Sequence, residues 1–284
     1  MSKYDFLESF LQKCDDSKRR RRLTPLQQIS SARIKLHDSV LINFSSNDYL
    51  GLSSSEQVKK AAAEAIDKHG NGSTASRLVC GTHVLHTQLE ESIAEWKGKP
   101  AALLFNSGFQ ANAGIIPAIA DRKTLIFSDK LNHASIVDGI RLSGAQHLRY
   151  AHADMNKLKQ LLEKFAGDNT RKIIISETLF SMDGDFTDVH TLAQLAQDYD
   201  ALLYLDDAHG SGICGPQGRG PAHEIIDEVD FYVGTFGKAL GSFGAYCACS
   251  ENIKDYLVNC ARSFIFSTAL PPAVVAANIA AINQ

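Results

Sequence analysis

A single lysine lies in the middle of a glycine-rich stretch, residues 234–241 (GTFGKALG), that directly follows the apolar run 231–233. A lysine that forms a Schiff base needs a partly dry pocket, because desolvation lowers the pKa of the amine and provides the neutral nucleophile. The glycines let backbone and ligand approach closely, and Thr235 offers a hydroxyl to a phosphate. Taken alone, the stretch also fits a lysine on an exposed glycine-rich turn. Lys238 is therefore a candidate nucleophile whose role depends on its neighbours.

Two aspartates and a histidine follow the apolar run 201–205. Adjacent residues of a strand point to opposite faces, so Asp206 and Asp207 cannot share a metal ion while the chain stays extended. A single carboxylate that holds a cationic heteroaromatic nitrogen fits this position better. We therefore predict no metal site here and take Asp206 and His209 as candidate cofactor ligands.

Three further motifs also follow apolar runs. Residues 106–110 (NSGFQ) open a helical stretch, whose free N–H groups and positive dipole end favour an anion. In residues 132–135 (NHAS) we expect Asn132 to be a helix N-cap and His133 to lie in the first helical turn. The first motif alone also fits an ordinary strand-to-helix turn, and a lone histidine in the position of His133 is usually a surface or capping residue. Residues 177–185 (ETLFSMDGD) are by themselves only an acidic turn.

The elements that must position these residues begin at residue 101, where short apolar runs start to alternate with helical segments. This alternation indicates an α/β fold, and we expect three α/β/α layers with a mostly parallel seven-stranded sheet. Ligands of such sheets bind at the carboxyl ends of the strands, where all the motifs above fall. The expected strands are 101–105, 124–127, 147–150, 172–176, 201–205, 231–233 and 245–248, and the expected helices between them include 109–119, 155–165 and 192–199.

The preceding part of the chain is predicted to be more irregular. Tyr4, Leu7 and Phe10 recur at helical spacing, so we expect an amphipathic helix from residue 4 to about residue 20, which ends in the basic run 18–22. Residues 40–44 form a strand candidate. Residues 55–68 and 82–96 are expected to be helical, and Gly70 closes the first of them.

Composition limits the class of protein. With 284 residues, 44% of them hydrophobic and 21% charged, the chain is expected to be globular with an ample core. The formal net charge of -3 gives no reason to expect nucleic acid as a partner. No apolar stretch approaches the ~18 residues of a membrane helix and no signal-peptide pattern is present, so we expect no membrane partner and a cytoplasmic location. The six cysteines lack metal-ligand spacing, so we expect reduced, mostly buried thiols. No strand is followed by GxGxxG, which argues against a dehydrogenase-like nucleotide binder.

Together these motifs supply what pyridoxal 5'-phosphate needs: a lysine amine, a carboxylate for the pyridine nitrogen and an anion cradle. The chain resembles the fold-type I pyridoxal phosphate enzymes and, within them, the α-oxoamine synthases. The stretches that carry the resemblance run in family order: 43–52 (NFSSNDYLGL), 132–135 (NHAS), 180–185 (FSMDGD), 206–210 (DDAHG), 234–239 (GTFGKA) and 266–272 (FSTALPP).

The resemblance implies roles for residues around the cofactor ring. Lys238 would hold the cofactor as a Schiff base and later act as the general base at the substrate α-carbon. Asp206 would keep the ring nitrogen protonated, and His133 would stack on the ring and contact the substrate. Ser181 and His209 would approach the phenolic oxygen of the ring.

The resemblance also implies a phosphate site and a partner subunit. Backbone groups of Gly108 and Phe109, with Thr235, would hold the cofactor phosphate. Ser267 and Thr268 fall where family members reach the phosphate of a neighbouring subunit, so a homodimer is implied.

The implied activity is that of a pyridoxal phosphate-dependent acyltransferase, which condenses an amino acid with an acyl thioester and releases carbon dioxide. The motifs are most similar to members that join L-alanine to a pimeloyl thioester, of coenzyme A or of a carrier protein, in biotin synthesis. Glycine C-acetyltransferases remain an alternative, because they also carry the sequences NHASI and GKALG. Arg21 could be a solvated helix end, but it falls where the family has a substrate-binding arginine.

Three parts of the chain are expected: an N-terminal helix and strand segment (1–44), a large cofactor-binding domain (45–270) and the start of an interdomain helix (271–284). Family members continue into a smaller α/β domain, which carries an arginine for the substrate carboxylate and closes the site. These 284 residues are expected to lack that domain. A second class of function is therefore open, in which the chain folds, dimerises and binds pyridoxal phosphate without turnover.

Overall fold

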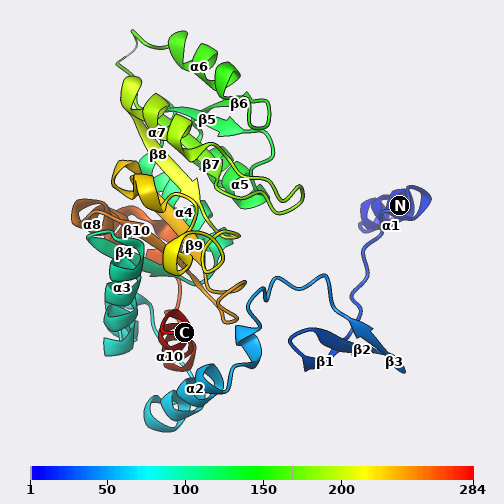
Figure 1. Cartoon of the computed structure of the whole chain (residues 1–284). Coiled ribbons are helices and arrows are strands. Elements are labelled where there is room, and N and C mark those ends of the chain that lie inside the picture. The colour runs from blue at the N-terminus through cyan, green and yellow to red at the C-terminus, as the bar shows by residue number, and fades with distance from the viewer. Residues whose placement is uncertain (1, 168) are drawn as a thin grey trace. The chain divides into compact units, whose positions relative to one another are not determined.

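The computed structural model describes residues 2–167 and 169–284, and the chain divides into two compact units, residues 1–45 and 46–284 (Figure 1). The smaller unit contains helix α1 (Asp5–Asp16) and an antiparallel sheet of β1 (Gln27–Ser30), β2 (Arg33–Leu36) and β3 (Ser39–Ile42). The first two of these strands were not expected from the sequence. The helix also ends earlier than predicted, because the chain takes a positive φ of 54° at Lys18.

The larger unit is built on a seven-stranded sheet with the order β4-β10-β9-β8-β7-β5-β6 (Figure 1). Neighbouring strands from β9 to β6 run parallel, whereas β10 is antiparallel to both β4 and β9. The predicted α/β fold with a mostly parallel seven-stranded sheet is therefore confirmed. The strands are β4 (Ala101–Phe105), β5 (Leu125–Asp129), β6 (Gln146–Tyr150), β7 (Lys172–Glu177), β8 (Ala201–Asp206), β9 (Phe231–Thr235) and β10 (Ala245–Cys249).

Helices cover the sheet, and most begin where a side chain caps the first turn. Ser107, Asp154, Asp188 and Ser250 each accept a hydrogen bond from a backbone N–H in the first turn of the following helix. The last helix packs against the first two helices of this unit. The helices are α2 (Glu56–His69), α3 (Val84–Lys97), α4 (Gly108–Ile119), α5 (Ala134–Ser143), α6 (Met155–Glu163), α7 (Val189–Asp198), α8 (Glu251–Cys260), α9 (Arg262–Ile265) and α10 (Pro272–Ile282).

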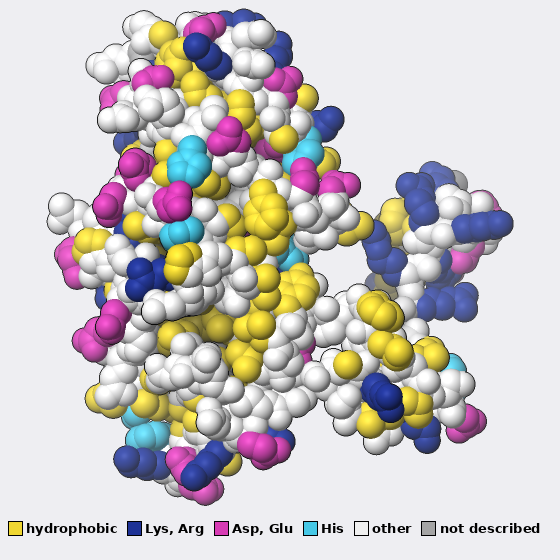
Figure 2. Space-filling model, viewed as in Figure 1, with side chains coloured by type: hydrophobic (Ala, Val, Ile, Leu, Met, Phe, Trp, Pro, Cys, Tyr) yellow, Lys and Arg dark blue, Asp and Glu magenta, His cyan; other side chains and the backbone are white. Residues whose placement is uncertain are grey.

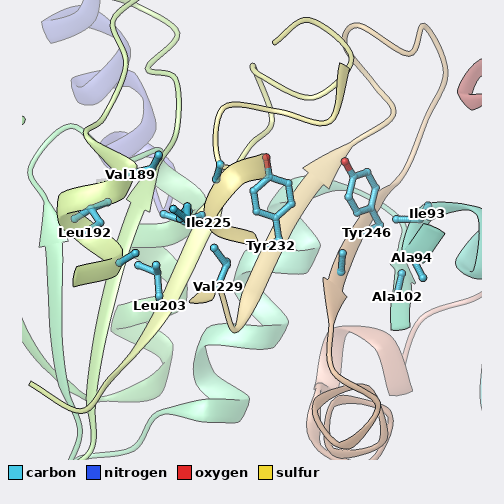
Figure 3. Close-up of a cluster of buried hydrophobic side chains, with 14 of the residues drawn as sticks. Ile93, Ala94, Ala102, Val189, Leu192, Leu203, Ile225, Val229, Tyr232 and Tyr246 are labelled. Carbon is cyan, nitrogen blue, oxygen red and sulfur yellow. The ribbon is translucent and has the colours of Figure 1, made fainter. Parts of the chain in front are cut away.

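Alternating side chains of the strands enter two hydrophobic cores, one on each face of the sheet. Leu203 belongs to one core and its neighbour Tyr204 to the other. Figure 3 shows part of the first core, where the rings of Tyr232 and Tyr246 lie on neighbouring strands. Both sheet faces are thus buried, which leaves the strand ends as the places where polar side chains can reach a ligand.

The surface of the larger unit carries interspersed acidic and basic side chains, with a group of exposed hydrophobic side chains on the face seen in Figure 2. Among residues 2–167 and 169–284, no helix has both the length and the apolar character needed to cross a membrane. The cysteines are free thiols, but the expectation that most are buried is wrong. Only Cys247 and Cys249 are buried, while Cys80 and Cys260 are exposed, because these two lie on the surfaces of a turn and of a helix end.

Candidate active site

A cleft at the carboxyl ends of the parallel strands brings together seven of the residues singled out from the sequence. Its volume is about 160 Å³. The strands β8 and β9 end at the cleft, as do the segments that follow β4 and β5. The predicted residues that line it are Gly108, Phe109, His133, Asp206, His209, Thr235 and Lys238.

Lys238 begins a chain of hydrogen bonds that leads out of the cleft. Its Nζ lies 2.6 Å from Nε2 of His209, whose Nδ1 lies 2.8 Å from the hydroxyl of Tyr49. Burial lowers the pKa of Lys238, against the opposing effect of the Asp206 carboxylate. Burial, and then the charge of Lys238, lowers the pKa of His209 to about 4. A neutral imidazole can therefore accept a hydrogen bond from Lys238 on Nε2 and donate one to Tyr49 from Nδ1. The Tyr49 hydroxyl in turn donates to Asn47 Oδ1 at 3.1 Å.

Asp206 is held by helix α4 and by the turn that follows its own strand. Its Oδ2 accepts a hydrogen bond of 2.8 Å from Nδ2 of Asn112, and its Oδ1 accepts one of 3.0 Å from the N–H of Ala208. Asn112 is itself fixed, because its Oδ1 accepts from the Tyr204 hydroxyl and its Nδ2 also donates to Ser135 Oγ. Asn112 was not predicted from the sequence. Its position one helical turn after Gly108 was the available signal, since residues four apart share a helix face.

Asp207 points away from the cleft, as predicted for the neighbour of Asp206 in an extended chain. It accepts hydrogen bonds from the hydroxyls of Thr178, at 2.5 Å, and Ser211, at 2.6 Å. The Nζ of Lys97 lies 3.8 Å from Asp207 Oδ2. Burial raises the pKa of Asp207 and lowers that of Lys97 to about 7. This second aspartate therefore anchors the end of β8 in the core.

His133 occupies the cleft in a different local role from the one expected. It is the N-cap of α5, and its Nδ1 accepts from the N–H of Ser135. Asn132, the predicted cap, instead binds strand β7, where its Oδ1 accepts from the N–H of Glu177 at 3.2 Å. The Glu177 carboxylate in turn accepts the N–H of His133 at 2.6 Å. Burial, reinforced by a neighbouring carboxylate, raises the pKa of Glu177 to about 8, so this unpredicted cleft residue is a neutral acid at pH 7.

The start of α4 offers donors for an anion. The N-cap Ser107 uses its hydroxyl and its carbonyl for the third and fourth N–H groups of the helix. The N–H groups of Gly108 and Phe109 have no acceptor within the helix, and both residues line the cleft. Thr235 lines the cleft too, although its hydroxyl donates to the Gly244 carbonyl at 2.9 Å.

Four predicted residues lie outside this cleft. Ser181 lines two adjoining pockets, one shared with His209 and the other with His133 and Glu177. The pair Ser267 and Thr268 lines a separate narrow cavity, and Ser267 Oγ accepts from a glutamine of α4. Arg21 is an exposed residue of the smaller unit. The functional roles of these four residues stay predictions.

Comparisons with known proteins show the family to which the chain belongs. Residues 39–283 match the family model described as aminotransferase class I and II. The 8-amino-7-oxononanoate synthase of Geotalea daltonii is 55% identical over 89% of this chain and 65% of its own length, so the chain spans less than two thirds of that relative. A structure of serine palmitoyltransferase with pyridoxal phosphate is 29% identical with a TM-score of 0.90, over 99% of this chain and 71% of the other. The 8-amino-7-oxononanoate synthase structure from Francisella tularensis is 32% identical with a TM-score of 0.72, over 84% of this chain and 68% of the other.

Proposed function

This chain belongs to the aminotransferase class I and II family, and we propose that it binds pyridoxal 5'-phosphate and acts in the synthesis of 8-amino-7-oxononanoate. In the proposed reaction L-alanine condenses with a pimeloyl thioester, and carbon dioxide and the free thiol leave. One observation carries the proposal: Lys238, an amine with a lowered pKa, shares a cleft with the carboxylate of Asp206. The identity to relatives that bear this enzyme's name supports the choice of these substrates.

The donor set of the cleft fits the cofactor. Lys238 would supply the amine for its aldehyde group, and Asp206 would supply the acceptor for a protonated ring nitrogen. The free N–H groups of Gly108 and Phe109 suit the phosphate, because a helix N-terminus stabilises an anion. When bound, pyridoxal phosphate supplies an electron-accepting ring, which stabilises negative charge at the α-carbon of the amino acid.

The protein's own groups would control the protons. Lys238 Nζ takes the proton from the α-carbon of L-alanine, which its lowered pKa favours because more of the amine is neutral. His209 stays neutral beside it and does not add a second positive charge to the cleft. Asp206, which Asn112 holds in place, would accept a hydrogen bond from the ring nitrogen and so keep it protonated.

The active form is proposed to be a homodimer in the cytoplasm. Ser267 and Thr268 lie beside large apolar side chains that are unusually exposed, with 79% exposure at Val79 and 70% at Phe266. The turn around Val79 packs against α9, so these side chains belong to one region. An apolar surface of this kind is typical of a protein interface. Sedimentation of wild type and Val79→Asp tests this proposal, since the charge is expected to convert dimer to monomer.

The decisive experiment records the visible spectrum of the purified chain with pyridoxal phosphate, with Lys238→Ala as control. L-alanine and glycine are then titrated in parallel. A cofactor band that shifts at lower L-alanine than glycine supports the proposal, and formation of 8-amino-7-oxononanoate from pimeloyl thioester completes it. Preference for glycine would favour the glycine C-acetyltransferase alternative. A band that neither amino acid shifts would indicate cofactor binding without turnover, and a missing band would remove Lys238 from its proposed role.

A further inference from the structure

One wall beside the cleft is the loop of residues 178–187 between β7 and α7, called here the wall loop. Its two ends pair with each other through a β-bridge between Leu179 and Phe186. Within it, the N–H of Phe180 donates to the carbonyl of Asp185 at 3.0 Å, and the N–H of Gly184 donates to the carbonyl of Phe180 at 2.9 Å. The wall loop is therefore a compact hairpin.

The tip of this hairpin faces the candidate active site. Phe180 and Ser181 line both pockets that adjoin the Lys238 cleft. One of these pockets shares His209 with the cleft, and the other shares His133. A displacement of the wall loop would therefore change the space next to the cofactor and substrate positions.

His152, which follows strand β6, ties the wall loop to the sheet. Its Nε2 lies 2.8 Å from Oδ2 of Asp185 in the wall loop, and its Nδ1 lies 3.1 Å from both oxygens of Asp129 at the end of β5. The His152 ring also packs edge-on against Phe180, with 4.5 Å between ring centroids. Asp129 is 1% exposed, and its carboxylate accepts the N–H of Ala153 as well. One end of this link is thus fixed in the core.

The link requires a doubly protonated imidazole. Both partners are carboxylates, which only accept hydrogen bonds when ionised, so each ring nitrogen of His152 must donate. A neutral imidazole has one N–H, and its other nitrogen would set a lone pair against a carboxylate oxygen. Asp185 Oδ1 is buried and has no hydrogen-bond partner among the described residues, so the carboxylate depends on His152. Asp183 is a third carboxylate within the same cluster.

The charges around His152 favour this state. Burial by itself lowers the pKa of His152, but the hydrogen bonds that it donates to Asp185 and Asp129 outweigh burial, and the net pKa is raised. The imidazolium therefore persists to higher pH than in a free histidine. It is lost as the pH rises through the raised pKa.

We propose that His152, as an imidazolium, is a positioning residue that holds the wall loop beside the cleft and so sustains the affinity for the amino-acid substrate. The substrate part of this inference rests on the proposed function. The loop part does not, because it concerns contacts between His152, Asp129 and Asp185 alone.

Amide hydrogen exchange of the wall loop tests the inference without cofactor or turnover. The reporters are the N–H groups of Phe180 and Gly184, measured at pH 6.5 and pH 9 and corrected for the intrinsic rate. In the wild type we expect protection to fall about tenfold or more at the higher pH, the scale of a charged hydrogen bond. In His152→Gln we expect low protection at both pH values. The matched control is His190→Gln, which removes a surface histidine 3.5 Å from Glu224 and should behave as wild type.

A second variant and a second readout keep the test decisive. Asp185→Asn retains the shape of the contact but not its charge, so we expect its protection to lose most of the pH dependence. With the cofactor bound, the dissociation constant for L-alanine should be about tenfold higher in His152→Gln than in wild type at pH 6.5, and the two should converge at pH 9. Equal protection in wild type and His152→Gln at pH 6.5 would overturn the inference. Expected exchange with no cofactor band would instead overturn only the proposed function.

Discussion

Replacing Asn112 by aspartate tests how the cleft holds Asp206. The substitution keeps the size of the side chain but places a second carboxyl 2.8 Å from Asp206 Oδ2. At an effective dielectric constant of about 20, two carboxylates at this distance repel by about 6 kcal/mol. The pair therefore keeps one proton instead, and that energy corresponds to a pKa of the new carboxyl raised by about 4 units.

The sign of the pH dependence follows from this raised pKa. The folded variant holds a proton that the unfolded chain releases above about pH 4, so its stability falls as the pH rises. Relative to wild type, Asn112→Asp should lose about 1.5 kcal/mol at pH 5 and about 5 kcal/mol at pH 8. The loss at pH 8 approaches the 5–15 kcal/mol that stabilises a typical domain.

Urea unfolding at pH 5 and pH 8, followed by circular dichroism, measures the difference. Asn252→Asp, an exposed substitution in the first turn of α8, serves as the matched control and should change stability little at either pH. If Asn112→Asp loses equal stability at both pH values, the defect is one of packing. The contact between Asn112 and Asp206 would then not be sensitive to charge.

Three further predictions concern the same region. In Gly234→Ala the new Cβ would lie 2.3 Å from the hydroxyl oxygen of buried Tyr246. Thermal unfolding should therefore show that the free energy of unfolding falls by about 1–3 kcal/mol or more. Gly237→Ala is the control and should be tolerated, because its new Cβ would lie 3.6 Å from the nearest atom. Because the pKa of Glu177 is raised to about 8, the stability of the wild type should fall as the pH rises from about 4.5 to about 8. In Glu177→Gln the free energy of unfolding should depend less on pH over this window, and the variant should be more stable than wild type at pH 8. Asp206→Ala should nearly abolish product formation while the protein stays folded, and near-normal rates would contradict its proposed role at the ring nitrogen.

The sequence was sufficient to predict the strands of the large sheet and most of the cleft, for one physical reason. Buried parallel strands are short apolar runs, and their carboxyl ends meet at one edge, so polar residues just after the runs converge. Lys238, Asp206 and His209 satisfy this rule. The strands β1 and β2 were missed because they are short and largely exposed, which leaves no clear alternation of apolar side chains.

The remaining features depend on tertiary contacts that local pattern does not encode. Asn112 lies inside an apolar helix, and its importance appears only once α4 is packed against β8. The neutral state of Glu177 depends on burial by several segments. Ser181 lies beside the cleft rather than in it, because the course of its loop is set by contacts such as that of His152 with Asp185.

The opposite directions of Asp206 and Asp207 have a consequence for the lengths that β8 can tolerate. Strand β8 pairs residue for residue with β7, with Ser176 opposite Leu205 and Glu177 opposite Asp206. A one-residue insertion or deletion within β8 would exchange the two carboxylates, which would send the cleft acid into the core and the core acid into the cleft. A single insertion or deletion would therefore misplace both carboxylates. We therefore expect length changes near β8 to be tolerated only in the turn before Ala201, at the other end of the strand. The length of that turn does not set the register of the strand.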